Sequence, residues 1–260
     1  MSEFTEFTQV ADRVWVARYE AYDVNVTVVE GEAGLLVVDT HASVEEGRAV
    51  LADLRRLSSR PLVAVVNTHE HFDHTFGNEA FLEEGAVPVI AHETAAARMT
   101  ASVPADTTFS SVTAVDLGDR AVELVHPGRG HTGGDLVARI GDADVLLAGD
   151  LVEESGMPAY GDDSYPLEWP WSLDLVLELV GPDTVVVPGH GAPVGRDFVQ
   201  DQRSAIGVVA QTIRDLAARG VPVDQALATT EWPYPREHLA DAVRRGYAQL
   251  PRSEKRLPLA

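Results

Sequence analysis

The chain has 260 residues, of which 45% are hydrophobic and 23% are charged, proportions that are ordinary for a globular protein. Its formal net charge of −21 repels phosphate polymers and anionic membranes, so we expect neither nucleic acid nor a membrane as a partner. The absence of cysteine excludes disulfides, thiolate metal sites and a cysteine nucleophile, and no run of about 18 apolar residues is present to span a bilayer.

The N-terminal part of the chain is predicted to alternate strands and one helix. Residues 1–13 are acidic and lack the basic start and apolar stretch of a secretory signal, so we expect a cytoplasmic protein. Valine-rich segments bounded by polar or glycine turns predict three strands, at 13–18, 24–30 and 34–40. A helix is predicted over 43–57, where apolar residues recur at helical spacing and Ser43 with Glu46 forms a capping box. A short apolar strand follows at 61–68.

The rest of the chain mixes both element types before it turns helical. Helices are predicted at 76–84, at 92–99 and, opened by Ser172, at 172–180. Strands are predicted at 87–91, 111–118, 121–128, 135–141, 144–150 and 184–191. From residue 196 onward the apolar residues follow helical periodicity. Such mixed ordering predicts an α+β protein with helices outside packed sheets.

The segment NTHEHFDH, residues 67–74, concentrates polar side chains at the end of an apolar strand. It supplies His69, His71, Asp73 and His74. Such a density of charge and imidazole beside a buried strand is costly unless something compensates it.

Three further candidates lie at strand ends or in glycine-rich turns: His131 in GRGHTGGD, Asp150 in LLAGD and His190 in VVVPGHG. Side chains at strand ends can converge from distant sequence positions. Neutral imidazole and carboxylate are ligands of zinc, and also of iron or manganese. Five histidines and two aspartates exceed what one tetrahedral ion takes, but they suit two adjacent cations that share a carboxylate. Two such cations would supply the compensating charge.

In this order, VVDT, THEHFDH (as H-x-H-x-D-H), GHTGGD, AGD and PGHG resemble the motifs of the metallo-β-lactamase-fold hydrolases. The resemblance covers roughly residues 10–195. It implies a four-layer αββα sandwich with the site at one edge between the two sheets. We therefore predict a catalytic domain at 1–195 and a helical C-terminal extension at 196–260 that packs on it.

The resemblance also implies a role for each candidate ligand. The first ion would be held by His69, His71 and His131. The second would be held by Asp73, His74 and His190, with Asp150 bridging both. Asp39, in VVDT, matches the family's aspartate that braces the histidine loop by hydrogen bonds. The implied cofactors are two Zn²⁺ per chain, with iron or manganese as alternatives.

The function that this resemblance implies is hydrolysis of a small-molecule carboxylic ester, thioester or lactone by a metal-bound hydroxide. Asp73 would orient the nucleophile and take part in proton transfer. A bridging Asp150 is more typical of the family's thioesterases and lactonases than of its true β-lactamases. Some lactonases carry a tyrosine three residues after this aspartate, where this chain has Glu153. A β-lactam hydrolase and a mononuclear iron persulfide dioxygenase of the same fold remain alternatives.

The segment 151–171 is too long and irregular to be a minimal connection. Its aromatic side chains include Tyr160, Tyr165 and Trp169, which we expect to line one wall of the substrate cleft. The alternative is a core plug between the sheet and the C-terminal helices.

Overall fold

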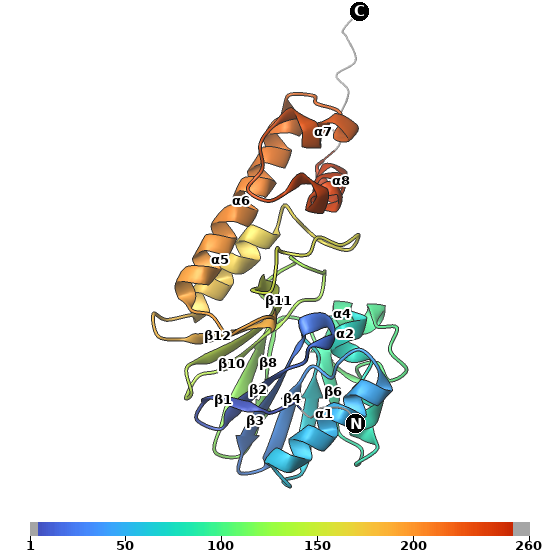
Figure 1. Ribbon diagram of the computed structural model, residues 1–260, viewed down its shortest axis with the longest axis vertical. Coiled ribbons are helices and arrows are strands. Elements are labelled where there is room, and N and C mark those ends of the chain that lie inside the picture. Colours follow the sequence, from blue (N-terminus) through green and yellow to red (C-terminus); the bar gives the residue numbers. More distant parts are fainter. Residues whose placement is uncertain (1–4, 252–260) are drawn as a thin grey trace, which may run out of the picture.

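The computed structural model describes residues 5–251 and contains two mixed β-sheets with helices on both outer sides (Figure 1). The seven-stranded sheet has the order β1 (Thr8–Ala11), β2 (Val14–Arg18), β3 (Asn25–Gly31), β4 (Gly34–Val38), β5 (Leu62–Val66), β6 (Val89–His92), β7 (Thr107–Phe109). The five-stranded sheet has the order β12 (Val185–His190), β11 (Val145–Glu153), β10 (Val137–Ile140), β9 (Ala121–Val125), β8 (Val112–Asp116).

The helices of the described residues fall into two sets. Those on the side of the seven-stranded sheet are α1 (Val44–Leu57), α2 (Phe72–Thr75), α3 (Asn78–Leu82) and α4 (Glu93–Arg98), with the short 3-10 turn η1 (Ala21–Asp23). Those on the other side are α5 (Trp169–Leu179), α6 (Arg196–Ala218), α7 (Val223–Thr229) and α8 (Ala240–Gln249), with η2 (Arg236–His238). Within residues 5–251, no helix combines the length and apolar character that crossing a bilayer requires.

Strand β4 shows how the sequence builds the layers. Leu36 and Val38 point into the core between the two sheets, whereas Leu35 and Val37 point into the core beneath α1. Successive side chains of a strand alternate between its faces, so a strand covered on both faces is apolar throughout. All five residues of β4 are buried.

Strand β11 has the same property in the other sheet. Leu147 joins the core between the sheets, while Leu146 and Ala148 join the core beneath α5 and α6. The layers are therefore helix, sheet, sheet and helix. This confirms the predicted α+β sandwich.

Two predicted helices differ from the observed ones. The helix expected over 76–84 is shorter than predicted: α3 spans Asn78–Leu82, and a separate short helix, α2, ends before it at Thr75. Gly77 lies between them, at a position where a Cβ would collide with the carbonyl oxygen of Thr40. The helix expected to open at Ser172 begins at Trp169. The hydroxyl of Ser172 instead donates to the carbonyl of Arg129. In contrast, Ser43 caps α1 as predicted, accepting a hydrogen bond from the Glu46 amide at 3.1 Å.

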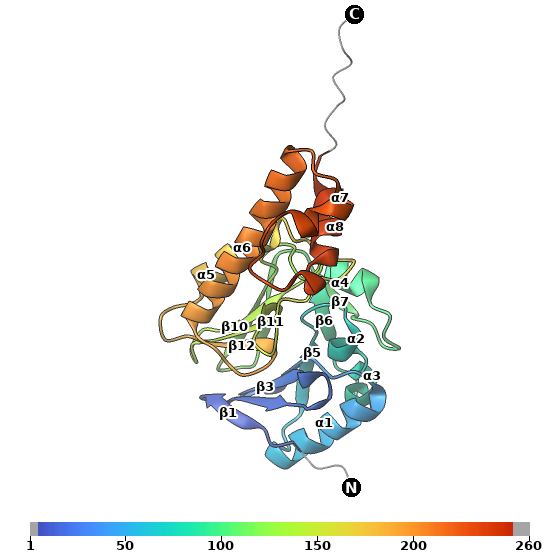
Figure 2. The ribbon, with the colours of Figure 1, turned by 45° about the horizontal axis from the view of Figure 1, so that its top comes forward.

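A helical C-terminal region is present, as predicted. Figure 2 shows α6 running alongside α5, with α7 and α8 at its far end. The inward face of α6 carries Ile206, Val209 and Ile213, which share one core cluster with β11 and α5. This face explains why residues after 195 pack on the sandwich. Residues 252–260 of the predicted extension lie outside the described residues.

Candidate metal centre

The loop after β5 is braced by Asp39, which follows β4 and has a φ of 64°. Because β4 and β5 are parallel neighbours, their carboxyl ends meet at one edge of the sheet. Asp39 accepts hydrogen bonds from the amide and the hydroxyl of Thr68, both at 2.9 Å. Its second oxygen also lies 2.8 Å from Nδ1 of His74. Asp39 therefore fixes both the loop and the orientation of the His74 ring, as the resemblance implied.

The other sheet brings Asp150, His190 and His131 to the same edge. Asp150 lies in β11 directly after Gly149, which has a φ of 52° and passes so close to Thr68 that a Cβ would lie 2.8 Å from its Cβ. His190 ends β12, the parallel neighbour of β11. His131 lies in the loop between β9 and β10. All seven predicted ligands thus gather at one end of the sandwich.

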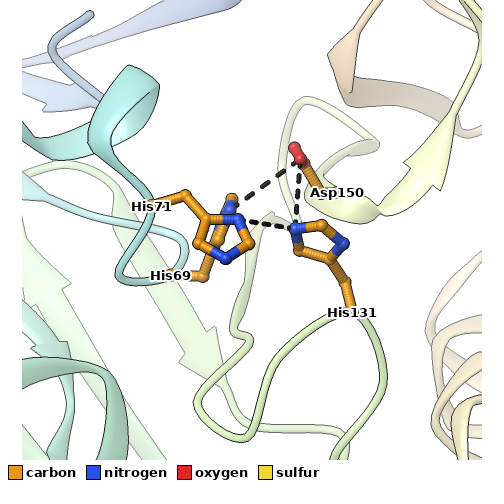
Figure 3. Close-up of side chains that lie close together, drawn as sticks. All are labelled: His69, His71, His131 and Asp150. Carbon is orange, nitrogen blue, oxygen red and sulfur yellow. Dashed lines mark hydrogen bonds and ion pairs between the residues drawn. The ribbon is translucent and has the colours of Figure 1, made fainter. Parts of the chain in front are cut away.

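One group of ligand atoms comprises His69, His71, His131 and Asp150 (Figure 3). Nδ1 of His71 lies 2.9 Å from Nε2 of His131. One Asp150 oxygen lies 3.4 Å from Nε2 of His131 and 3.8 Å from Nε2 of His69. The ligand atoms of this group all lie within 4.8 Å of one another.

A second group comprises Asp73, His74 and His190. Nε2 of His74 lies 3.2 Å from Nε2 of His190, and Oδ2 of Asp73 lies 3.4 Å from the latter. Asp150 reaches this group as well, with Oδ1 at 3.2 Å from His74 and Oδ2 at 3.2 Å from His190. Asp150 therefore contacts both groups.

The outward nitrogen of each ring has its own partner. Nδ1 of His131 lies 2.9 Å from the carbonyl of Ala159, and Nδ1 of His190 lies 2.8 Å from that of Tyr22. A carbonyl accepts only, so these nitrogens carry a proton, and in the neutral ring Nε2 keeps a free lone pair. That is the tautomer that binds a metal through Nε2.

The donor set fits divalent cations. Nε2 of His69 is buried and has no hydrogen-bond partner within the described part of the chain, and the buried Oδ1 of Asp150, although 3.2 Å from Nε2 of His74, makes no hydrogen bond of good geometry there. Buried polar atoms without partners are rare and costly. Converging imidazole nitrogens and carboxylate oxygens suit zinc, and a cation between them would satisfy both atoms.

The electrostatics of the metal-free cluster point the same way. Burial holds the pKa of His69 well below its usual range and lowers that of His131 to about 4, so both rings are neutral. At His190 burial acts in the same direction, but Asp150 outweighs it and raises the pKa to about 9. Burial would raise the pKa of Asp150, but His74 and His190 hold it well below its usual range. Protons on the second group thus compensate Asp150, and a cation would replace them.

A cavity of about 550 Å³ opens over both groups. Its floor includes the ligands His71, Asp73, His131, Asp150 and His190. Its walls are Tyr22, Phe72, Glu153, Ser155, Gly156, Met157, Ala159, Tyr160 and Gly161. Among the residues that the structure describes, no lysine or arginine lines this cavity.

The predicted cleft residues divide in two. Tyr160 lines the cavity. Trp169 does not, because α5 directs it into the core, where it is fully buried and its Nε1 donates to the carbonyl of Leu151. Tyr165 lies between the guanidinium groups of Arg129 and Arg245, 4.4 and 5.5 Å from its ring centre. The expectation that Tyr165 and Trp169 line the cleft is therefore wrong: Trp169 is a core plug, and the partly buried Tyr165 stacks with two arginines outside the cavity.

Two wall residues were missed by the sequence reasoning. Tyr22 and Phe72 meet edge to face with ring centres 5.2 Å apart, and they are 55% and 42% exposed. Phe72 lies between the predicted ligands His71 and Asp73 in the H-x-H-x-D-H motif. This position in the motif could have indicated that its aromatic ring lies beside the metal centre. Tyr22 lies in η1 and has a φ of 63°. The apolar periodicity of the sequence does not predict such a backbone conformation.

Glu153 is a further buried carboxylate beside the ligands. One of its oxygens accepts hydrogen bonds from the amide and hydroxyl of Ser155, at 3.1 and 2.6 Å. Burial, followed by the charge of Asp150, raises its pKa to about 7. Its ligand atom lies within 4.8 Å of those of Asp150 and His190. The position at which some lactonases carry tyrosine therefore holds an acidic group at the cavity edge.

Comparison with known proteins identifies the family. A family model described as the metallo-beta-lactamase superfamily matches residues 19–190. The chain belongs to this superfamily. Its metal-binding cluster is thus that of a family of metal-dependent hydrolases.

Individual relatives place the similarity along the chain. The metallo-beta-lactamase type 2 of Bacillus cereus is 29% identical over 199 residues, which cover 71% of this chain and 75% of that protein. The linear primary-alkylsulfatase of a Pseudomonas species is 43% identical over 72 residues, 26% of this chain and 14% of that protein. The structure of a metallo-beta-lactamase from Pontibacter korlensis, 25% identical, superposes with a TM-score of 0.69 over 78% of this chain and 98% of that one.

Proposed function

We propose that the protein is a dinuclear metal-dependent hydrolase that acts on a neutral carboxylic ester, thioester or lactone. The observation that carries the proposal is the position of Asp150, whose carboxylate contacts both groups of candidate ligands. A carboxylate in this position suits two adjacent cations, whereas a mononuclear iron site would use it with histidines of the first group alone. A mononuclear iron dioxygenase would leave Asp73, His74 and His190 without a cation, so we disfavour it.

The protein's own residues divide the work. His69, His71 and His131 would hold the first cation; Asp73, His74 and His190 the second; and Asp150 both. When bound, such a pair polarises a carbonyl and lowers the pKa of water from about 15.7 toward about 7. The side chain of Asp73 is 14% exposed and lines the cavity. Its carboxylate is thus placed to orient a water in the cavity and to accept its proton.

The walls of the cavity favour an uncharged acyl compound. Tyr22, Phe72, Met157 and Tyr160 offer apolar surface, and Glu153 offers a carboxyl group. β-Lactams generally carry a carboxylate and alkyl sulfates carry a sulfate. A cavity without lysine or arginine gives such anions no cationic side chain to bind, and the net charge of −21 repels them. A neutral ester, thioester or lactone needs no cationic partner and is not repelled by the negative charge of the protein.

β-Lactam hydrolysis is the second candidate function. It is favoured by the Bacillus cereus relative, whose match spans 75% of that protein. The same cations and the same carbonyl chemistry would serve it. The two candidate functions differ in whether the cavity walls must bind a substrate that carries a carboxylate.

The test is a substrate panel assayed with the zinc-loaded protein. It contains short and medium acyl esters, acyl thioesters, lactones, β-lactams, alkyl sulfates and oligonucleotides. We expect the highest kcat/KM on a neutral acyl compound and loss of activity on treatment with a chelator. Preferential turnover of β-lactams would favour the second candidate. Preferential turnover of alkyl sulfates or oligonucleotides would contradict the proposal.

A further inference from the structure

His71 is oriented differently from the other ligands. Its Nδ1, not its Nε2, faces the cluster, 2.9 Å from Nε2 of His131. Its Nε2 points away and lies 3.0 Å from Oδ2 of Asp163. A ring that ligates through Nδ1 carries its proton on Nε2, so His71 would donate that proton to the carboxylate.

Asp163 comes from the segment between β11 and α5, residues 154–168, and not from the motif that supplies His71. Its other oxygen approaches Gly161 so closely that a Cβ there would lie 2.7 Å away. Asp163 and His71 are each about one third exposed, with side-chain exposures of 32% and 30%. The carboxylate therefore reaches the ring at the rim of the cavity.

The C-terminal helix α8 holds this segment in place. The carbonyl of Ser164, next to Asp163, accepts hydrogen bonds from Nε of Arg245 at 3.1 Å and from Nε2 of Gln249 at 2.9 Å. Gly246 lets α8 approach closely, since a Cβ there would lie 2.7 Å from Cγ2 of Ile213 in α6. The link runs from α8 through the Ser164 carbonyl to Asp163 and then to His71.

We propose that Asp163 is the positioning residue of the metal ligand His71, and that helix α8 of the C-terminal region fixes Asp163 through the Ser164 carbonyl. The inference rests on the proposed metal centre. A carboxylate on the outer nitrogen of a ligating histidine fixes the tautomer and the ring plane and increases the basicity of the ligand. The C-terminal helices would thus act on the metal centre without touching it.

The first test is zinc affinity, measured by competition of the metal-free full-length chain with a chromophoric chelator. Asp163→Ala is expected to weaken the affinity of the first ion about 10- to 100-fold. Asp163→Asn keeps an acceptor oxygen and is expected to recover part of that loss. The matched control is Asp162→Ala, since Asp162 is 81% exposed and lies beside Arg244 at 3.6 Å. Its affinity is expected to stay within about twofold of the wild type.

The second test asks whether α8 acts through Asp163. Gln249→Ala is expected to weaken zinc binding less than Asp163→Ala does, and the same holds for Arg245→Met, which keeps the aliphatic stem. Arg244→Met is the control, because Arg244 pairs with Asp241 within its own helix at 2.7 Å and reaches the segment at the exposed Asp162, 3.6 Å away, rather than at the Ser164 carbonyl. In the Asp163→Ala background, Gln249→Ala is expected to cause little further loss of zinc affinity, because both substitutions interrupt the same connection between α8 and His71.

The outcomes separate the inference from the proposed function. If the wild type binds no zinc, the metal centre itself fails. If the wild type binds zinc and a folded Asp163→Ala variant binds it within twofold of the wild type, Asp163 does not position His71. If Gln249→Ala causes the same loss with and without Asp163, the route through the Ser164 carbonyl is wrong. Circular dichroism shows which variants are folded. If Arg245→Met does not fold, Gln249→Ala still tests whether α8 acts on Asp163 through the Ser164 carbonyl.

Discussion

Asp39 and His74 are joined by a contact of 2.8 Å between Oδ2 and Nδ1, and both side chains are almost fully buried. Because Nε2 of His74 faces His190, this contact aligns the ring with the second group of ligands. Removing the carboxylate by Asp39→Ala also leaves the amide of Thr68 without its acceptor. We expect zinc affinity at the second site to fall about 10- to 100-fold and unfolding free energy to fall by about 1–3 kcal/mol.

Asp39→Asn is the matched variant, because its amide oxygen can still accept from Thr68. We expect it to keep most of the stability but not the full affinity, as measured by urea unfolding and by zinc competition. Equal affinity for the wild type and both variants would show that Asp39 serves the fold alone.

Zinc binding is expected to release protons. The pKa of His190 is raised to about 9 in the metal-free protein, mainly because the attraction of Asp150 exceeds the effect of burial. Below that pH a cation must displace the proton on His190, and the pKa of His74 is also raised, because Asp150 outweighs burial there. Apparent affinity at the second site therefore rises by about tenfold or more per pH unit. Calorimetric titration at pH 7 in buffers of different ionisation enthalpy counts the protons. An affinity that does not change between pH 6 and pH 8 would contradict this picture.

The aromatic wall is expected to govern substrate binding. Tyr22 and Phe72 keep 55% and 42% of their surface exposed beside the ligands, and an apolar substrate would cover part of it. Tyr22→Ala or Phe72→Ala should each remove roughly 1 kcal/mol of binding, which raises KM about fivefold with metal content unchanged. Val112→Ala, at a side chain that is 63% exposed and outside the cavity walls, is the control. If KM stays constant in both wall variants, the substrate does not contact this wall.

Trp169 is expected to matter chiefly for stability, and its ring also meets those of His131 and Tyr160 edge to face, with centres 5.8 and 5.1 Å apart. It is fully buried in the core between the five-stranded sheet and the C-terminal helices. Trp169→Ala should lower the unfolding free energy by about 3–5 kcal/mol. Trp171→Ala on the same helix is the control, because Trp171 is 62% exposed and only stacks on Arg214, so the loss there should be about 1 kcal/mol or less. If a folded Trp169→Ala variant had an altered acyl preference, Trp169 would influence substrate binding as well as stability.

The sequence predicted the parts of the molecule that depend on local pattern. The apolar strand ahead of His69 and the capping by Ser43 both appear as expected, because each depends on neighbouring residues. Apolar strands that end in polar ligands also indicated where those ligands would meet.

The parts that sequence could not predict depend on contacts over long separations. The need for glycine at position 77 follows from the nearby carbonyl of Thr40, and the direction of Trp169 follows from where α5 begins. Asp163 reaches His71 across 92 positions, from a segment without regular structure. The pattern of apolar residues in the sequence does not predict such a contact, because it depends on how α8 holds the segment 154–168.

We propose that two cations share Asp150. Asp150→Ala is therefore expected to retain the first ion, lose the second and lower kcat by roughly a hundredfold or more, because the group common to both sites is gone. Metal content per chain, measured by inductively coupled plasma mass spectrometry beside kcat, checks both effects.

The most direct measurement is activity during stepwise addition of zinc to the metal-free wild type. We expect kcat to rise until about two equivalents of zinc are bound per chain. Full activity at one equivalent per chain would contradict the dinuclear site.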